Sequence, residues 1–199
     1  MKTSWTTVDL LNSKLAEGSC LFLDMDGVLA NFYPYFRKYF RNRLIIKGVN
    51  PNEVTISTYI KYKKIKEIVH ELCEEEGVDF WINMPKTNNC TYYWNHLKPI
   101  RDRIIILTGI YPEMTSAVEG KSIWIKNNLG LPDNRIIFNP DKAKYATYDG
   151  HINLLLDDSI ENVDSFSRAG GIGLWESGKR IIAEHNVYGR ILPFFEKVL

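Results

Sequence analysis

The stretch Cys20-Leu21-Phe22-Leu23-Asp24-Met25-Asp26-Gly27 is the part of the sequence that decides the fold class. Four apolar residues run without a break and stop at an aspartate, which is typical of a strand buried on both faces of a parallel sheet. Four more short apolar runs follow, at 103–107, 135–138, 152–156 and 171–175. Helical segments separate these runs, at about 113–129, 141–147 and 159–168. This alternation predicts an α/β fold, a Rossmann-like three-layer parallel sheet with helices on both faces.

A long helical segment interrupts the alternation directly after the first strand. An aromatic-rich stretch with helical spacing runs from Leu29 to Ile46, and a second helical pattern runs from 51 to 76. The character of the sequence changes between Gly77 and Thr91. We therefore expect a core formed by residues 1–29 and 89–199, with a small helical cap at 30–88 over the end of the first strand.

Composition and charge exclude several classes of protein. Of the 199 residues, 45% are hydrophobic and 25% are charged, as in a folded globular chain. Lys and Arg number 25 against 24 Asp and Glu, so the basic excess that extended nucleic-acid binding needs is lacking. The apolar runs are too short to span a membrane, and the helical spacing from about Thr6 to Leu15 lacks the apolar core of a secretion signal. Cys20, Cys73 and Cys90 lack metal-site spacing, so we expect reduced thiols and a cytoplasmic protein.

Polar residues follow three of the predicted strands at the point where each strand ends. Asp24 and Asp26 follow the first strand, and Thr108 and Gly109 follow the second. The pair Asp157-Asp158 follows the fourth. Ligands bind outside the carboxyl ends of strands in an open parallel sheet, so these groups converge if the strands are neighbours. Four carboxylates at close range need a cation, because each raises the pKa of the others, and oxygen ligands without nearby His or Cys favour Mg²⁺.

Three lysines supply candidate positive charge for a phosphate. Lys121 lies near the start of a helical segment, and Lys142 and Lys144 lie in the loop before the fourth strand. Any single lysine is usually an ordinary surface residue. Beside acidic strand ends, however, a lysine can neutralise a phosphoryl group that is held by Mg²⁺. The sequence leaves open whether Lys142 or Lys144 takes this part.

The chain resembles the haloacid dehalogenase superfamily in four motifs, which lie in the right order between about residues 19 and 175. These motifs are the run DMDGVLA at 24–30, the strand end at Thr108, the lysines, and Asp157-Asp158. The longer run DMDGVLANF at 24–32, with KSIW at 121–124 and LLLDD at 154–158, is similar to the 5′(3′)-deoxyribonucleotidase branch. The sequence departs from that branch at Gly109, where the branch has a phosphate-binding Ser, and at Ser159, where it has an Arg.

The resemblance implies a phosphatase that works through a covalent intermediate. Asp24 would attack phosphorus and form an aspartyl-phosphate, which splits one hard hydrolysis into two easier steps. Asp26 would protonate the leaving oxygen and then activate water. Dehalogenases of this superfamily lack the second aspartate, so phosphate is the better substrate class.

The resemblance also implies how the phosphate and the metal are held. The phosphoryl oxygens would be bound by Thr108, the Gly109 amide, Lys121, and one of Lys142 and Lys144. The Mg²⁺ site would include Asp24 and the Asp26 backbone carbonyl. Asp157 and Asp158 would complete it, one by direct ligation and the other through water, and the sequence leaves open which does which.

The cap is expected to select the leaving group of the substrate. It begins with a cluster of aromatic residues: Phe32, Tyr33, Tyr35, Phe36 and Tyr39. Packing between cap helices accounts for most of them. Phe32 resembles the residue that stacks on the base in deoxyribonucleotidases, a contact worth about 1–3 kcal/mol. The resemblance therefore implies a nucleoside monophosphate as the substrate.

Three other functions are compatible with these motifs. They are a phosphatase for another small phosphomonoester, a phosphatase for nucleic-acid ends or phosphoproteins, and a binding module that kept the fold without catalysis. The lysine-rich run at 61–66 is followed by glutamates at 71–76, which favours a solvated amphipathic helix over a nucleic-acid patch. The four histidines share no ligand spacing and are expected at the surface or in packing: His70, His96, His151 and His185.

Overall fold

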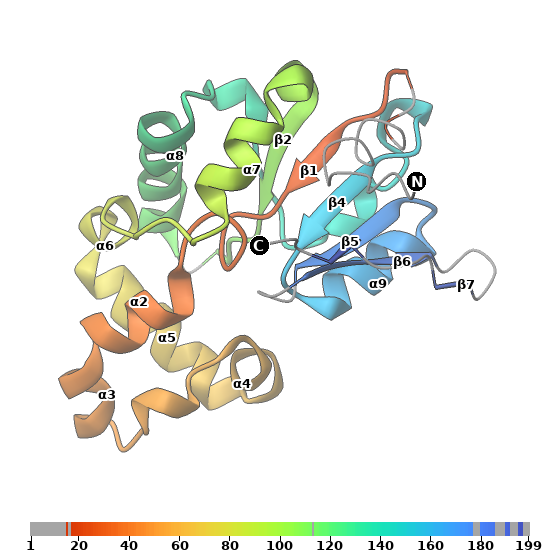
Figure 1. Cartoon of the computed structure of the whole chain (residues 1–199). Helices are drawn as coiled ribbons and strands as arrows, with labels where there is room; N and C mark the ends of the chain where they lie inside the picture. Colours follow the sequence, from red (N-terminus) through yellow and green to blue (C-terminus); the bar gives the residue numbers. More distant parts are fainter. Residues whose placement is uncertain are drawn as a thin grey trace.

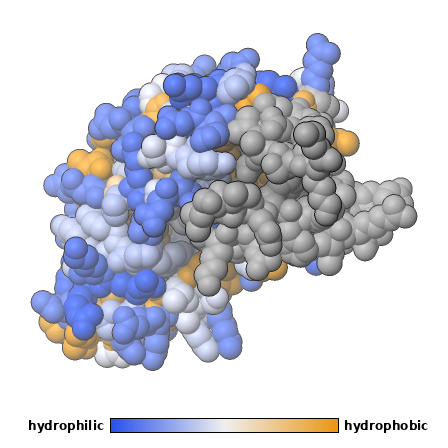
Figure 2. Space-filling model, viewed as in Figure 1, coloured by the Kyte–Doolittle hydropathy of each residue, from blue (hydrophilic) through white to orange (hydrophobic). Residues whose placement is uncertain are grey.

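A computed structural model describes residue 15, residues 17–112 and 114–176, and the backbone of three strands at 180–185, 190–191 and 195–196. The helix expected from about Thr6 to Leu15 lies outside the described residues except at its last position. No helix in the described part of the chain is both long enough and apolar enough to cross a membrane. The described surface in the view of Figure 2 is mostly hydrophilic, with small separate hydrophobic areas.

The centre of the molecule is a sheet whose first five strands are parallel. They are β1 (Leu21–Leu23), β2 (Ile104–Thr108), β3 (Ile136–Phe138), β4 (Leu154–Asp157) and β5 (Ile172–Glu176). Their order in the sheet is β3-β2-β1-β4-β5, as Figure 1 shows in part. Antiparallel strands extend the β5 edge: β6 (Arg180–His185), β7 (Arg190–Ile191) and β8 (Phe195–Glu196). The predicted α/β parallel fold is confirmed, whereas the sequence pattern did not reveal the antiparallel extension.

Strand β1 lies between β2 and β4, and this placement brings the three polar strand ends together. Leu23 is in register with Ile106 on one side and with Leu156 on the other. Leu21 and Leu23 enter one hydrophobic cluster, and Phe22 enters a second cluster on the opposite face. All three side chains are fully buried because a parallel strand is covered on both faces. The unbroken apolar run is the sequence signature of that double burial.

Helices cover both faces of the sheet. Those near β2 are α7 (Cys90–His96) and α8 (Thr115–Leu129), and α9 (Ile160–Arg168) packs against β4 and β5. Short 3-10 turns complete the connections: η2 (Lys98–Arg103), η3 (Asp133–Arg135), η4 (Lys142–Tyr145) and η5 (Tyr148–Gly150). The helix expected at about 141–147 is therefore wrong in type. Thr147 leaves the helical region at φ −127°, and Asp149 takes a positive φ of 55°, so the chain turns toward β4.

The segment between Ala30 and Lys86 forms a separate group of helices at the carboxyl ends of the strands (Figure 1). Its elements are α2 (Phe32–Tyr39), α3 (Arg41–Ile46), η1 (Pro51–Glu53), α4 (Ile56–Lys61), α5 (Lys63–Glu76) and α6 (Val78–Ile82). We call this segment the insertion. Its two ends lie side by side, because Ala30 and Lys86 form an antiparallel bridge and the Asn31 amide donates to the Pro85 carbonyl at 2.8 Å.

Two contacts fix the insertion against helix α8. Trp81 of α6 lies on Gly120, where an added Cβ would come within 2.4 Å of the Trp81 Cβ, so glycine permits this close approach. The Glu74 carboxylate of α5 accepts hydrogen bonds from the Ser116 amide at 3.1 Å, from the Ser116 hydroxyl at 2.8 Å and from the Thr115 hydroxyl. Glu74 thereby pairs with unsatisfied N–H groups in the first turn of α8.

Candidate active site

The turn after β1 holds Asp24 at the centre of the three strand ends. The Asp24 amide donates to the Leu156 carbonyl at 2.9 Å, and the Met25 amide donates to Asp24 Oδ1 at 2.8 Å. Gly27 takes a φ of +83°, and a Cβ there would lie 1.9 Å from Asp158 Oδ2. Only glycine suits this position, on grounds of both conformation and space.

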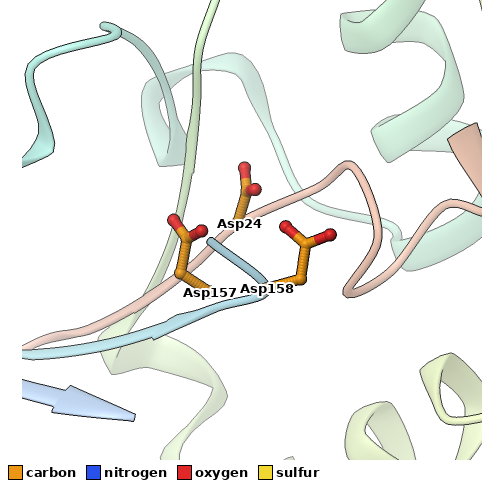
Figure 3. Close-up of side chains that lie close together, drawn as sticks. All are labelled: Asp24, Asp157 and Asp158. Atoms are coloured by element: carbon orange, nitrogen blue, oxygen red, sulfur yellow. The ribbon is translucent and has the colours of Figure 1, made fainter. Parts of the chain in front are cut away.

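Asp24, Asp157 and Asp158 form an acidic cluster, with one oxygen of each within 4.8 Å of the others. Figure 3 shows the three carboxylates on the same side of the strand ends. Burial raises the pKa of Asp24 to about 7; Lys142 opposes this shift, and the Asp157 charge adds to it. Burial and the charges of Asp24 and Asp157 also raise the pKa of Asp158. An all-oxygen donor set whose members repel one another fits a hard divalent cation such as Mg²⁺.

Lys142 lies inside the cluster, and Lys144 does not. The Lys142 ammonium is buried, 2.8 Å from Asp24 Oδ1 and 2.5 Å from Asp157 Oδ2. Burial alone would lower the pKa of Lys142, but the charges of Asp157 and Asp24 raise it overall. The Lys144 side chain is 66% exposed and pairs with Asp141. Of the two lysines that the sequence left open, only Lys142 is brought to the strand ends.

Lys121 reaches the site from helix α8 and joins two strand ends. Its buried ammonium donates to Asp26 Oδ2 at 2.6 Å, to the Thr108 hydroxyl at 2.9 Å and to the Gly109 carbonyl at 3.1 Å. The other carboxylate oxygen of Asp26, Oδ1, is buried and has no hydrogen-bond partner among the described residues. Such an orphaned oxygen is available to a substrate group or to water.

Asp157 and Asp158 differ in what surrounds them. The Asp157 carboxylate accepts the Ser159 amide at 2.8 Å and the Asn162 amide group at 3.1 Å to each oxygen, besides its contact with Lys142. Among the described residues no hydrogen-bond donor reaches the Asp158 carboxylate, although the Trp175 indole donates to the Asp158 backbone carbonyl. Asp157 is thus held by the protein, and Asp158 is left for another ligand.

A pocket opens directly over these strand ends, and its cavity measures about 160 Å³. Its charged lining residues all lie at one end: Asp24, Asp26, Asp158, Lys121 and Lys142. The rest of the lining contributed by the insertion and by the loop after β2 is uncharged, and includes Phe32, Tyr33, Ile56, Tyr59, Ile60, Val69, Trp81, Ile110 and Tyr111. The pocket therefore has a charged end, formed at the sheet, and a neutral aromatic end.

Phe32 lines the pocket but is closely packed by other aromatic rings. It is 5% exposed, and its ring lies 5.7 Å from that of Trp81 and 5.8 Å from that of Phe36, with interplanar angles of 15° and 25°. Phe80 meets it edge-on at 5.9 Å. The structure places Phe32 at the neutral end of the pocket, where it forms part of a stacked wall.

The sequence interpretation missed several residues that the structure brings to the pocket. Asn162 lies in the first turn of α9, five residues after Asp157. The polar residues that follow the Asp157-Asp158 pair could have been included as candidates on that ground. Tyr111 follows the Thr108 strand end by three residues and could have been found in the same way. Tyr59 carries no such signal, because α4 reaches the pocket only through the packing of the insertion.

The fold and the site together define the class of protein. A parallel sheet of order β3-β2-β1-β4-β5, with the two aspartates of DMD after β1, Thr108 after β2 and Asp157-Asp158 at β4, is that of a phosphatase of the haloacid dehalogenase superfamily. Within it, the chain belongs to the family described as 5′ nucleotidase, deoxy (pyrimidine), cytosolic type C protein, whose model it matches over residues 18–186.

Solved structures agree with this fold. One is a haloacid dehalogenase-like hydrolase from Bacteroides fragilis, with a TM-score of 0.52 and 16% identity, covering 78% of this chain and 85% of that one. Another is a HAD hydrolase, family IA, variant 3, from Entamoeba histolytica, with a TM-score of 0.50 and 13% identity, covering 78% and 82%. A search of the curated proteins finds no match. At these identities the solved structures show the fold alone.

Proposed function

We propose that this phosphatase is a Mg²⁺-dependent nucleotidase that hydrolyses nucleoside monophosphates through an aspartyl-phosphate. The observation that carries the proposal is the division of the pocket. Every charged lining residue lies where a phosphate would bind, and the opposite end offers aromatic rings and tyrosine hydroxyls. A nucleoside monophosphate has the same division, with a charged phosphate and a neutral leaving group that has both polar and apolar parts.

The arrangement of Asp24 and Asp26 supports the two steps of the reaction. Asp24 Oδ1 is held by the Met25 amide and by Lys142, which leaves the second oxygen for attack on phosphorus. As the Asp24–phosphorus bond forms, the bond from phosphorus to the leaving oxygen breaks, and Asp26 gives that oxygen a proton through Oδ1. Asp26 then accepts a proton from water, which attacks the aspartyl-phosphate, releases phosphate and restores Asp24.

The remaining polar groups support phosphate and metal binding. Asp24, Asp158 and the Asp26 backbone carbonyl would hold Mg²⁺, which supplies positive charge to the phosphoryl oxygens when bound. Asp157 would position Lys142 and take part through water, since its own oxygens are already engaged. Lys121 would hold the Thr108 hydroxyl toward the phosphate, because the two groups are 2.9 Å apart.

The neutral end of the pocket favours a nucleoside over the other leaving groups. A nucleic-acid end carries further phosphates, and a phosphoprotein presents an extended chain, yet no charged residue of the described chain lines that end of the pocket. The buried ion pairs that Lys142 forms with Asp24 and Asp157 favour a catalytic site over a module that only binds its ligand. The family description, a cytosolic deoxynucleotidase for pyrimidines, agrees with this substrate class and with the predicted cytoplasmic location.

A phosphate-release screen tests the proposal. The purified protein is assayed with nucleoside and deoxynucleoside monophosphates, sugar phosphates, phosphopeptides and phosphorylated oligonucleotides, each with Mg²⁺ and with EDTA. We expect the highest kcat/KM on nucleoside monophosphates, no activity in EDTA, and recovery when Mg²⁺ is added. A clear preference for sugar phosphates or oligonucleotides would replace the substrate assignment, and full activity in EDTA would remove the metal from it.

A further inference from the structure

Four residues form a cluster where the insertion meets the loop after β2. Tyr59 comes from α4, Lys66 and His70 come from α5, and Tyr111 comes from the loop that begins at Gly109. Tyr59 and Tyr111 line the neutral end of the pocket. The cluster therefore connects the insertion to the same loop that forms part of the phosphate end.

Contacts within the cluster hold the Tyr59 hydroxyl in one place. Its oxygen lies 2.7 Å from His70 Nε2, a hydrogen bond. The His70 ring packs on Tyr111 with the ring centres 4.9 Å apart, and the Lys66 ammonium lies 3.6 Å from the centre of the Tyr111 ring. The Tyr59 ring itself contacts the rings of Tyr33 and Tyr111, with ring centres 6.2 Å and 6.4 Å away. A tyrosine held on several sides loses little entropy when it binds a ligand.

The position of Tyr59 relative to the acidic end is also informative. Burial, followed by the neighbouring Tyr111 and the Asp26 charge, raises the pKa of Tyr59, so the hydroxyl keeps its proton. A neutral tyrosine hydroxyl has one donor and two acceptor sites, and its hydrogen bonds with His70 and with the Tyr111 hydroxyl use two of these three sites. One site of the hydroxyl remains for a further hydrogen bond, and Tyr59 is a residue of the pocket lining.

We propose that Tyr59, oriented by His70, is a specificity-determining residue that hydrogen-bonds the nucleoside part of the substrate. This inference rests on the proposed function, because it assigns a partner to the leaving group and not to the phosphate. Tyr59 selects substrates that place a polar sugar or base atom beside its hydroxyl. His70 acts through Tyr59 as a positioning residue. A small aryl phosphate offers the hydroxyl no partner and gains nothing from it.

The test compares Tyr59→Phe with Tyr62→Phe on two substrates. Tyr59→Phe removes only the hydroxyl, and Tyr62, which is 46% exposed and outside the pocket lining, is a matched control. For the best nucleotide, Tyr59→Phe should raise KM by roughly tenfold with little change in kcat, as the loss of one hydrogen bond to bound substrate predicts. With para-nitrophenyl phosphate, neither KM nor kcat should change in Tyr59→Phe. Tyr62→Phe should behave as the parent on both substrates.

A double-mutant cycle tests the part taken by His70. His70→Leu should raise the nucleotide KM by a smaller factor than Tyr59→Phe, and the double variant should be no worse than Tyr59→Phe alone. Binding of the free nucleoside, measured by calorimetry, should weaken in parallel with KM. Full additivity of the two changes would overturn the positioning role.

The outcomes separate the inference from the function on which it rests. If the parent protein hydrolyses no nucleotide, the proposed function fails and this inference fails with it. If the parent hydrolyses nucleotides and Tyr59→Phe matches Tyr62→Phe, the inference alone is overturned. An equal loss on both substrates in Tyr59→Phe, with a lowered melting temperature, would show that the hydroxyl serves the fold and would also overturn it.

Discussion

The two ends of the pocket are built in different ways. At the charged end, ammonium groups each contact two or three acceptors: Lys142 bridges Asp24 and Asp157, and Lys121 bridges Asp26 and Thr108. At the neutral end, ring packing does most of the positioning, and a hydroxyl such as that of Tyr59 is held by uncharged tyrosine and by histidine side chains. The sheet thus fixes the groups that would act on phosphate, and the insertion supplies a wall that can differ without disturbing them.

The largest effect that would sharpen this contrast is expected at Asp24. Asp24→Asn should lower kcat by at least about 10³-fold, because an amide cannot attack phosphorus as a carboxylate does. The measurement is turnover on a nucleotide and on an aryl phosphate, with circular dichroism as the control for folding. Near-normal turnover by a folded Asp24→Asn protein would remove Asp24 from the mechanism.

The two lysines of η4 provide a matched pair for the next effect. Lys142→Met should lower kcat by roughly 10²-fold or more on both substrates and should also destabilise the protein, because it leaves Asp24 and Asp157 buried without their counter-charge. Lys144→Met, at an exposed position two residues away, should leave both properties close to those of the parent. Equal losses in the two variants would contradict the assignment of Lys142.

Metal binding should change the stability of the charged end in a pH-dependent way. The folded-state pKa of Asp24 is raised to about 7, so without metal its contribution to stability is present below its unfolded pKa of about 4 and is lost as the pH rises toward 7. Mg²⁺ should therefore raise the melting temperature more near pH 8 than near pH 5, where protons compete for the same oxygens. Thermal unfolding with Mg²⁺ and with EDTA measures this, and the same shift at both pH values would argue against a carboxylate metal site.

The smallest expected effect concerns the contact between insertion and core. Glu74→Ala should lower the free energy of unfolding by about 1–2 kcal/mol, since it removes the acceptor for the first turn of α8. Glu75→Ala, which removes only an exposed ion pair with Arg43, should cost less than about 1 kcal/mol.

The same contact has a defined pH dependence. Partial burial alone would raise the pKa of Glu74, but hydrogen bonds from Thr115 and Ser116 lower it overall. Its contribution is therefore present above the unfolded pKa of about 4.3 and is lost as the pH falls through the lower folded value. Urea unfolding of the parent and of Glu74→Ala, measured at a pH above the unfolded pKa of Glu74 and at a pH below its folded pKa, tests the prediction. No difference between Glu74→Ala and Glu75→Ala would show that the contact does not stabilise the insertion.

The contrast between the two ends also explains what could be predicted from the sequence. The strand-end groups Asp24, Thr108 and Asp157 follow apolar runs, so a local pattern was enough to place them, and the parallel order brought them together. The choice between Lys142 and Lys144 could not be made in this way. The two lysines are two residues apart on one 3-10 turn, and only the packing of that turn decides which side chain is buried.

The neutral end was much less accessible to sequence reasoning. Phe32 was expected there, but its packing against Trp81 depends on a contact between helices nearly fifty residues apart in the chain. Tyr59 and His70 lie eleven residues apart on two helices, and His70 was expected only at the surface or in packing. Their shared place beside Tyr111 results from the docking of the insertion onto the core, which no local pattern encodes.

The most direct test of the account is the ratio of kcat/KM for a nucleoside monophosphate to that for para-nitrophenyl phosphate. It is measured in the parent, in Thr108→Val at the charged end, and in Phe32→Leu and Tyr59→Phe at the neutral end. Thr108→Val should lower kcat/KM for the nucleotide and kcat/KM for para-nitrophenyl phosphate by the same factor. The ratio should then stay within about twofold of the parent value. Phe32→Leu, which removes a ring from the packed wall, and Tyr59→Phe, which removes a hydrogen bond to the nucleoside, should each lower the ratio by roughly fivefold or more. A ratio that changes in Thr108→Val, or that stays constant in both neutral-end variants, would contradict the division of the pocket.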